Sequence, residues 1–235
     1  MSEPWLILET SGRVGRVGLV RDGGVVQSAL LDETRRHARD LAPTIQSLLH
    51  REGLSPKDVH GVMVGIGPGS YTGLRVGVTS AKVFAYALGC RLVPVPTFRA
   101  IVERVPADRS AADVIGDALQ GHVYVQRYVR EKGGWAAADE LRIEPVSRWV
   151  EHLPPGATVT GPGAGVYSGS IPARVERVPS DLWEPSVESV FAAGAGMAPL
   201  GRDELYRLEP LYLRGSSAEE KAKRDGNAPS GVPPG

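Results

Sequence analysis

The glycine-rich segment GIGPGSYTGLRVG, residues 65–77, has the composition of a loop that binds an anion. It joins an apolar run to a helical pattern, and its glycines let the backbone approach a ligand closely. Backbone N–H groups at the start of a helix attract phosphate or carboxylate. The candidate contacts for a nucleotide or another anion are Gly67, Gly69, Ser70 and Thr72. A tight strand-to-helix turn, in which Gly73 and Gly77 allow close helix packing, is equally expected from this spacing.

The segment lacks the features of two well-known phosphate-binding loops. No Gly-Lys-Ser/Thr closes it, as in a P-loop, and no Gly-x-Gly-x-x-Gly opens the helix, as in dinucleotide-binding proteins. Its spacing alone therefore does not decide between anion binding and close packing.

Two carboxylates follow apolar runs that we expect to be strands. Glu9 begins the sequence Glu9-Thr10-Ser11-Gly12. In phosphotransferases a carboxylate at such a position holds a metal-bound water, and hydroxyls contact phosphate. Thr-Ser-Gly is also ordinary turn chemistry, which we favour here. Asp117 follows residues 114–116, and we interpret it as a cap for the adjoining turn rather than as a catalytic or metal-binding acid.

The other reactive residue types form no recognisable catalytic pattern. No two of the five histidines are four residues apart, so no familiar zinc motif is present and no metal site is expected. Cys90 is expected to be a small buried residue rather than a nucleophile. No Gly-x-Ser-x-Gly sequence frames a serine, so the sequence does not predict a hydrolase.

The apolar pattern predicts an α/β layer built on a mixed sheet. Three strands come first, with a turn at Asp22-Gly23-Gly24, followed by a helix, a strand, a second helix and a strand. The expected strands span residues 5–8, 16–20, 25–31, 62–66 and 91–95. The first expected helix spans about residues 40–52, with Asp40 as its cap and Pro43 in its first turn. The second spans residues 72–88.

The second half of the chain repeats this order of features, which indicates a duplicated lobe. Residues 114–117 correspond to residues 6–9, and Gly161-Pro162-Gly163 corresponds to Gly67-Pro68-Gly69. The predicted divisions are an N-terminal lobe of residues 1–103, a smaller lobe of residues 104–214 and a disordered tail of residues 215–235.

Charge and composition limit the classes of partner. The 27 basic residues equal the 27 acidic residues, so tight direct binding to RNA phosphates is not expected. The single cysteine allows no internal disulfide, and no apolar run reaches the roughly 20 residues of a membrane span. The sequence therefore indicates a protein of the reducing cytosol, cytoplasmic and without membrane association.

Residues 67–77 closely resemble the signature of the TsaB family, formerly called YeaZ. The resemblance runs from Ile7-Leu8-Glu9-Thr10-Ser11 through Gly116-Asp117-Ala118 to Pro210-Leu211-Tyr212-Leu213-Arg214. It implies an actin-like (ASKHA) α/β fold of two ribonuclease-H-like lobes with mixed sheets. It also implies a function in the synthesis of N6-threonylcarbamoyladenosine in tRNAs that read codons starting with A.

The resemblance further implies that the chain is a non-catalytic partner rather than an enzyme. TsaB-type proteins pair with and activate a TsaD-type transferase, and the pair recruits a TsaE-type ATPase. The chain itself would need no cofactor, with ATP or ADP bound within the complex and tRNA contacted only through the complex. The first two helices would form the partner surface, and in isolation the same surface would form a homodimer. The expected interface residues are Gly73, Gly77, Ala81 and Ala85.

Two residues depart from the family pattern. Glu9 stands where Asp is usual, which weakens any catalytic role at that position. Leu119 stands where Arg is frequent, so we assign no functional role to it.

Three other interpretations are weaker. A TsaD-type catalytic subunit would need a His-x-x-x-His pair, which the sequence lacks. A sugar or acetate kinase of the same fold would need a glycine-rich adenosine loop, for which residues 161–165 are the candidate. A peptidase, an old label of relatives, has no zinc motif or catalytic triad to support it.

Overall fold

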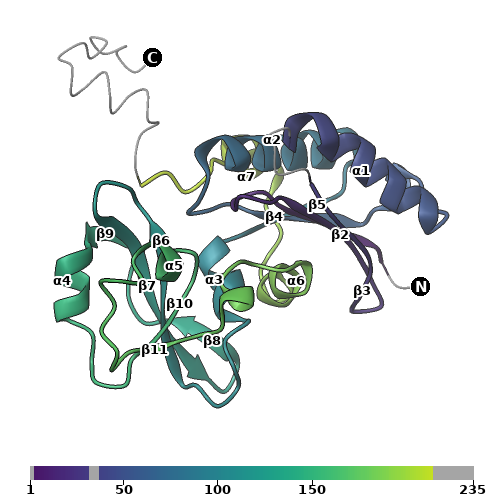
Figure 1. Ribbon diagram of the computed structural model, residues 1–235. Coiled ribbons are helices and arrows are strands. Elements are labelled where there is room, and N and C mark those ends of the chain that lie inside the picture. The colour runs from purple at the N-terminus through teal and green to yellow at the C-terminus, as the bar shows by residue number, and fades with distance from the viewer. Residues whose placement is uncertain (1–2, 32–36, 214–235) are drawn as a thin grey trace, which may run out of the picture.

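A computed structural model describes residues 3–31 and 37–213, which form two lobes, each built on a mixed sheet. Figure 1 shows the first lobe on the upper right and the second on the lower left, with helices α3 (Thr97–Val102) and α6 (Val187–Gly194) between them. The predicted tail, residues 215–235, lies outside the described residues.

The first sheet has the strand order β3-β2-β1-β4-β5. Strand β1 pairs antiparallel with β2 and parallel with β4, and β5 continues the parallel part. The strands are β1 (Trp5–Glu9), β2 (Arg16–Arg21), β3 (Gly24–Leu30), β4 (Gly61–Gly65) and β5 (Arg91–Val95). This arrangement confirms the predicted order of three strands, helix, strand, helix and strand.

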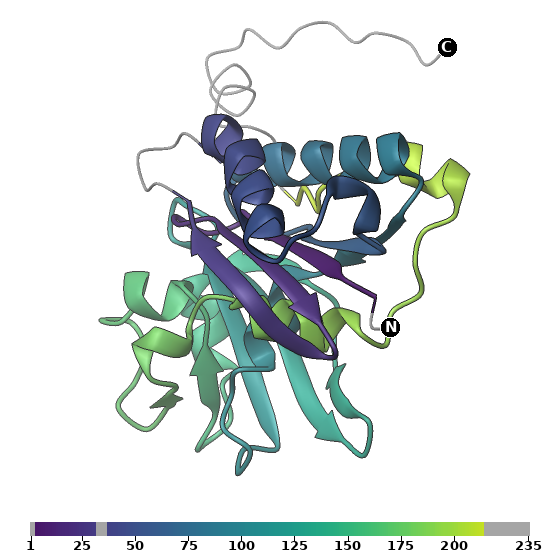
Figure 2. The ribbon, with the colours of Figure 1, turned by 90° about the vertical axis from the view of Figure 1, so that its right-hand side faces the viewer.

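Helices α1 (His37–Arg51) and α2 (Tyr71–Leu88) cover one face of this sheet (Figure 2). Helix α2 begins after Ser70, whose side chain accepts a hydrogen bond from the Gly73 N–H, and ends at Gly89 in the left-handed conformation. Between α1 and β4 lies a short 3-10 turn, Pro56–Asp58.

The prediction that Asp40 caps the first helix is wrong. The helix already includes His37, so Asp40 lies in its first turn and Pro43 lies inside it. A proline there removes one backbone hydrogen bond, and the packing of the apolar side chains that come after it, among them Ile45 and Leu48, compensates for the loss.

The other face of the first sheet is covered by the C-terminal part of the chain. Val187 and Val190 of α6 pack against Ile7 and Met63 on this face. The chain then returns to the first face, where Leu205 of helix α7 (Arg202–Arg207) reaches the core beneath α1 and α2. The predicted division at residue 103 is therefore corrected: the first lobe also contains the segment from α6 to residue 213. An apolar sheet face needs a cover, and here the chain supplies it from its distant end.

The second sheet has the order β11-β10-β6-β7-β8, with β9 paired to β7. Strand β6 pairs antiparallel with β7 and parallel with β10, as β1 does with β2 and β4, so the two lobes share their central topology. The strands are β6 (Ala111–Asp117), β7 (His122–Glu131), β8 (Gly134–Ala137), β9 (Arg142–Pro145), β10 (Thr158–Thr160) and β11 (Glu176–Arg177).

Helices α4 (Val146–Glu151) and α5 (Gly163–Val166) cover the outer face of the second sheet through Trp149 and Ala164. A 3-10 turn, Ser180–Leu182, leads back toward the first lobe. The inner face packs on α3, where Phe98 and Ile101 meet Val114. Within the described residues, no helix has the length and apolar character needed to cross a lipid bilayer.

Candidate functional site

The glycine-rich loop after β4 is bound to its own lobe through its backbone. The Ser70 N–H donates to the Ser11 carbonyl at 2.7 Å. The Gly67 N–H donates to Thr97 Oγ1 at 3.1 Å, and the Thr97 N–H donates to the Gly67 carbonyl at 2.8 Å. These internal partners occupy groups that an anion cradle would have to offer to a ligand.

The glycines of this loop and of α2 let the helix pass over the end of β1. A Cβ at Gly69 would collide with Ser11, one at Gly73 with the Thr10 carbonyl, and one at Gly77 with Thr10 Oγ1. Thr10 Oγ1 also donates to the Gly73 carbonyl at 2.7 Å. Gly69 lies just before α2, and the spacing of four residues places Gly73 and Gly77 on one face of the helix, so close packing is the role that the structure shows for these glycines.

The four candidate anion contacts have different surroundings. Gly67 is buried, whereas Gly69, Ser70 and Thr72 are exposed at the start of α2. The Ser70 hydroxyl caps the helix by accepting from the Gly73 N–H at 3.2 Å. Nucleotide or anion binding by these residues stays a prediction.

The expected interface residues Gly73, Gly77, Ala81 and Ala85 all lie on the buried face of α2. Ala81 is fully buried and Ala85 is 2% exposed. The prediction is corrected on this point: these side chains pack against their own lobe and cannot contact a partner while the lobe is folded. The small residues fit the helix to its own sheet, and the helix presents its other face to solvent.

The exposed face of α2 is apolar at its C-terminal end. Val83 is 61% exposed and Tyr86 is 60% exposed, and the Tyr86 ring meets the ring of Tyr206 with 5.7 Å between centroids. At the other end of the helix the rings of Tyr71 and Tyr212 lie 4.8 Å apart. We call Tyr71, Val83, Tyr86, Tyr206 and Tyr212 the tyrosine face.

Two cations of α2 hold the C-terminal segment against the helix. Arg75 stacks on the Tyr71 ring at 4.4 Å and donates to the Tyr212 hydroxyl at 3.2 Å. Lys82 Nζ donates to the carbonyls of Tyr206 and Leu208 at 2.8 and 3.0 Å. Sequence reasoning missed the tyrosine face because two of its five residues come from a segment more than a hundred positions away. The exposed positions of α2 alone, three and four residues apart, were a readable signal.

Glu9 at the end of β1 is buried, with 1% of its surface exposed. Its Oε1 accepts from the Ser11 N–H at 2.6 Å, whereas Oε2 has no partner among residues 3–31 and 37–213. Burial raises the pKa of this carboxyl, although the hydrogen bond from Ser11 opposes the shift. Gly65 makes room for it, because a Cβ there would collide with the Glu9 carboxylate. The turn interpretation therefore fits Glu9 better than a role in binding phosphate.

Asp117 at the end of β6 caps the turn after that strand, as its position beyond an apolar run suggested. Its Oδ1 accepts from the Leu119 N–H at 2.8 Å and from the Tyr167 hydroxyl at 2.7 Å. Leu119 and Gln120 have φ angles of 62° and 52°, which side-chain-bearing residues rarely adopt. The carboxylate of Asp117 stabilises this uncommon turn.

The glycines at residues 161–165, the candidate adenosine loop, pack closely against neighbouring parts of the chain. A Cβ at Gly163 would lie 3.0 Å from the backbone of Ile115 and Gly116, and one at Gly165 would lie 2.9 Å from the Trp183 ring. They repeat in the second lobe the packing of Gly69 and Gly73 in the first.

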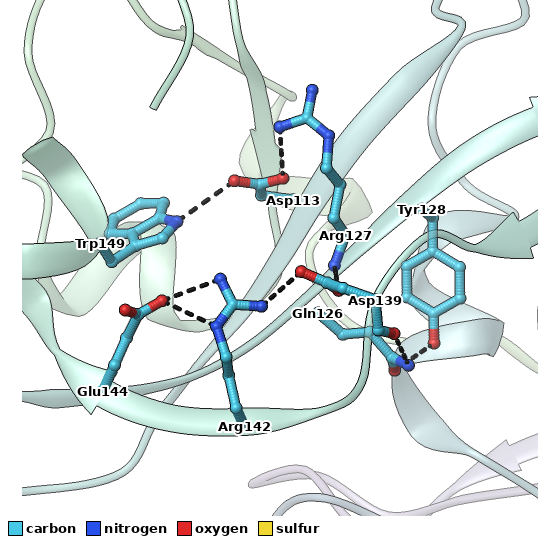
Figure 3. Close-up of polar contacts among 8 residues, drawn as sticks. All are labelled: Asp113, Gln126, Arg127, Tyr128, Asp139, Arg142, Glu144 and Trp149. Atoms are coloured by element: carbon cyan, nitrogen blue, oxygen red, sulfur yellow. Dashed lines mark hydrogen bonds and ion pairs between the residues drawn. The ribbon is translucent and has the colours of Figure 1, made fainter. Parts of the chain in front are cut away.

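A polar cluster that sequence reasoning did not identify surrounds Asp113 of β6 (Figure 3). Asp113 Oδ1 accepts from Arg127 Nη1, and its Oδ2 accepts from Trp149 Nε1, both at 3.2 Å. Asp139 accepts from the Arg127 N–H at 2.7 Å and pairs with Arg142. Burial raises the pKa of Asp113, and Arg127 opposes the shift. Each carboxylate here has partners from neighbouring strands, which is the arrangement of a structural network.

In the part of the chain that the structure describes, no group of three or more His, Cys, Asp or Glu side chains is placed to hold a metal ion. Cys90 is half-buried, and burial raises the pKa of its thiol.

Comparison with known proteins gives consistent relatives. Residues 4–160 match the family model described as tRNA N6-adenosine threonylcarbamoyltransferase, TsaD. The chain is 30% identical over 220 residues to an uncharacterized protein of Mycobacterium tuberculosis, covering 92% of this chain and 94% of that protein. It is 27% identical over 225 residues to the Escherichia coli tRNA threonylcarbamoyladenosine biosynthesis protein TsaB, covering 92% and 96%.

Solved structures agree with this similarity. YeaZ from Pseudomonas aeruginosa superposes with a TM-score of 0.74 at 25% identity, covering 90% of this chain and 100% of that chain. A second structure from that organism, described as an uncharacterized protein with similarity to peptidase YeaZ, gives a TM-score of 0.76 at 24% identity with the same coverage. With the topology of the two sheets, this likeness confirms the expected actin-like α/β fold.

Proposed function

This chain belongs to the threonylcarbamoyltransferase (TsaD) family and, within it, to the TsaB (YeaZ) group, and we propose that it is a non-catalytic partner that activates a TsaD-type transferase. The pathway is the synthesis of N6-threonylcarbamoyladenosine in tRNAs that read codons starting with A. The chain works in the cytoplasm, recruits a TsaE-type ATPase through the complex and contacts tRNA only through the complex. It needs no cofactor of its own, and ATP or ADP binds within the complex.

The observation that carries the non-catalytic role is that the glycines of the signature segment pack against their own lobe. Gly69, Gly73 and Gly77 are packed against Thr10 and Ser11, and Glu9 is buried behind them. A catalytic loop must leave its backbone N–H groups and its carboxylate within reach of a substrate. Here the residues best suited to chemistry fix α2 in place, and the exposed face of α2 remains for recognition.

The tyrosine face is the partner surface that we propose. Tyrosine is enriched at protein interfaces because it offers a large rigid apolar area together with a polar hydroxyl. Val83 and Tyr86 are both more than half exposed, which is uncommon for clustered apolar side chains unless they serve recognition. In isolation the same face forms the homodimer, because a two-fold contact uses one patch on both copies.

A reconstitution tests the function. The transferase, the ATPase, the donor-forming enzyme, tRNA, threonine, bicarbonate and ATP are combined with and without this chain, and the modified adenosine is quantified by mass spectrometry. We expect modification to require the chain, and the chain alone to make none. Equal modification in its absence would overturn the proposal.

A charge on the tyrosine face tests the surface separately. Val83→Glu buries a carboxylate in the proposed interface. We therefore expect the affinity for the transferase to fall at least tenfold, which corresponds to a loss of about 1.4 kcal/mol in binding free energy. Val166→Glu is the matched control, because Val166 is 59% exposed on α5 of the other lobe. Both variants should fold, since neither side chain is in a core. Equal affinities of the two variants would exclude this face as the interface.

A kinase of the same fold is the alternative function, and an assay of the purified chain alone tests it. ATP consumption by the purified chain with sugars or acetate as acceptors would favour it. The packed state of residues 161–165 argues against it, because an adenosine would need the space that Trp183 and the β6 backbone occupy.

A further inference from the structure

Two crossings of the chain join the lobes, residues 103–110 after α3 and residues 178–186 before α6. The crossings are tied to each other. Arg104 Nη1 donates to the backbone carbonyl of Glu184 at 2.6 Å, and Arg109 of the first crossing forms an ion pair with Glu176 of β11, just before the second. Beside them, Ala100 of α3 packs in one apolar cluster with Val190 of α6.

Glu184 connects these crossings to the first lobe. Its Oε2 accepts from Arg16 Nη1 at 2.9 Å, and Arg16 is the first residue of β2. Gly12, in the turn between β1 and β2, lies so near Glu184 that a Cβ added at this glycine would be 3.6 Å from the Glu184 carboxylate. The side chain of Glu184 thus reaches the β1–β2 hairpin, while its carbonyl holds the other crossing through Arg104.

The preceding residue faces the opposite lobe. Trp183 Nε1 donates to the Val178 carbonyl at 2.7 Å, and the indole ring packs on Gly165 of α5. Trp183 therefore anchors this crossing to the second lobe, and Glu184 anchors it to the first. A change in the angle between the lobes has to break one of these two attachments.

The charges around Glu184 make its role electrostatic as well as geometric. Burial lowers the pKa of Arg104, and the positive charge of nearby Arg16 lowers it further. The negative charges of Asp181, Glu188 and Glu184 oppose this shift. The side chains of Arg16 and Glu184 are 22% and 32% exposed, and such partial shielding makes an ion pair stronger than one fully in water.

We propose that Arg16, Glu184 and Arg104 form an interlobe clamp that holds the two lobes in one closed arrangement. When the clamp is broken, the lobes open about the two crossings, with the packing of α3 on α6 as the pivot. The clamp is a conformational device of this chain, and it stands whether or not the proposed partnership with the transferase is correct.

Charge reversal and its compensation test the clamp in the full-length chain. Arg16→Glu and Glu184→Arg each place like charges together, and the double variant restores an opposite pair. Hydrogen–deuterium exchange of residues 103–110 and 178–186 reports opening directly. We expect each single variant to exchange about tenfold faster in both crossings, and the double variant to return toward the wild-type rate.

Glu176→Arg is the matched control, because it breaks the exposed ion pair that Arg109 of the first crossing makes with β11, without involving the first lobe. It should leave exchange at residues 178–186 and at the β1–β2 hairpin unchanged. Circular dichroism verifies that every variant is folded. The clamp is wrong if the single variants exchange like wild type, if the control speeds exchange equally, or if the folded double variant restores nothing.

Discussion

The two lobes use the same packing device with different results. In the first lobe, Gly73 of α2 lies on the Thr10 carbonyl at the end of β1, and in the second, Gly163 of α5 lies on the backbone at Ile115 and Gly116 of β6. In both lobes the parallel strand next to the central one is followed by a glycine loop and a helix. The equivalent contact therefore follows from the duplicated topology.

The difference between the lobes lies in the length of the helix after the glycine loop. Helix α2 has 18 residues, whereas α5 has four. A long amphipathic helix covers the sheet with one face and presents the other face to solvent, as α2 does with Val83 and Tyr86. A helix of one turn has no room for a second face. The duplicated loop is thus followed by a long exposed helix face in one lobe only, and this is the face that we propose as the partner surface.

The buried carboxylates differ in the same way. In the second lobe both carboxylate oxygens of Asp113 accept a hydrogen bond, one from Arg127 and one from Trp149 (Figure 3). Glu9 in the first lobe has one oxygen with no partner among the described residues. The comparison teaches that a buried acid stabilises a lobe according to its partners and not according to its depth.

The largest expected effect is that of a side chain at Gly73. In Gly73→Val the added carbons collide with the Thr10 carbonyl, which a strand end cannot move far, so we expect a loss of about 3 kcal/mol or more in the free energy of unfolding. Urea denaturation followed by tryptophan fluorescence measures it. Gly169→Val is the control, because nothing lies within 4 Å of a Cβ there. Similar losses in both variants would refute the packing role of Gly73.

Removal of the Asp113 carboxylate is next in size. Asp113→Ala leaves Trp149 Nε1 and Arg127 without their acceptor, and we expect a loss of about 2–3 kcal/mol in the free energy of unfolding. Asp113→Asn keeps an acceptor oxygen for the indole and should lose clearly less. Thermal and urea unfolding of both variants give the comparison. If the two variants are equally unstable, the hydrogen bond to Trp149 contributes nothing.

A methyl group at Gly163 should cost less than the change at Gly73. The Cβ of Gly163→Ala would lie 3.0 Å from the β6 backbone, so a shift of a few tenths of an ångström by the short helix α5 relieves the contact. We expect a loss of about 1–2 kcal/mol by urea denaturation. A loss as large as that of Gly73→Val would show that the shorter helix is held as rigidly as α2.

The smallest effect at low pH is that of Glu9→Gln, and this effect grows as the pH rises. Burial raises the pKa of Glu9 in the folded state above its ordinary value of 4.5, so the folded state retains the proton longer than the unfolded state. Below that ordinary value both states are protonated and no penalty exists. As the pH rises past it toward the raised folded value, the unfolded state ionises first and the wild type loses stability.

Glu9→Gln removes this penalty, because an amide does not titrate. We expect the variant to differ from wild type by less than about 1 kcal/mol near pH 4 and to become relatively more stable as the pH rises to about 8. Urea denaturation across that range measures the difference. Val83→Glu, which titrates at the surface, serves as a comparison that should show no such gain. A pH-independent difference for Glu9→Gln would contradict the raised pKa of the buried Glu9 carboxyl.

The sequence by itself determined the order of elements in the first lobe and the repetition of that order in the second. Apolar runs of five to seven residues, the Asp22-Gly23-Gly24 turn and the helical spacing of Leu74, Val78 and Ala81 are local patterns that the folded chain obeys. The spacing of Gly73, Gly77, Ala81 and Ala85 also identified one helix face. Local periodicity is enough for such features because it comes from backbone geometry alone.

Only the tertiary structure decided what those faces meet. The glycine face of α2 was expected at a partner and instead lies on Thr10, and the segment after residue 186 was expected in the second lobe and instead covers the first sheet. Tyr206 and Tyr212 join Tyr86 and Tyr71 across more than a hundred residues. A periodic pattern shows that a face will be buried, but contacts between distant segments depend on how whole lobes close their cores, and no local spacing encodes that.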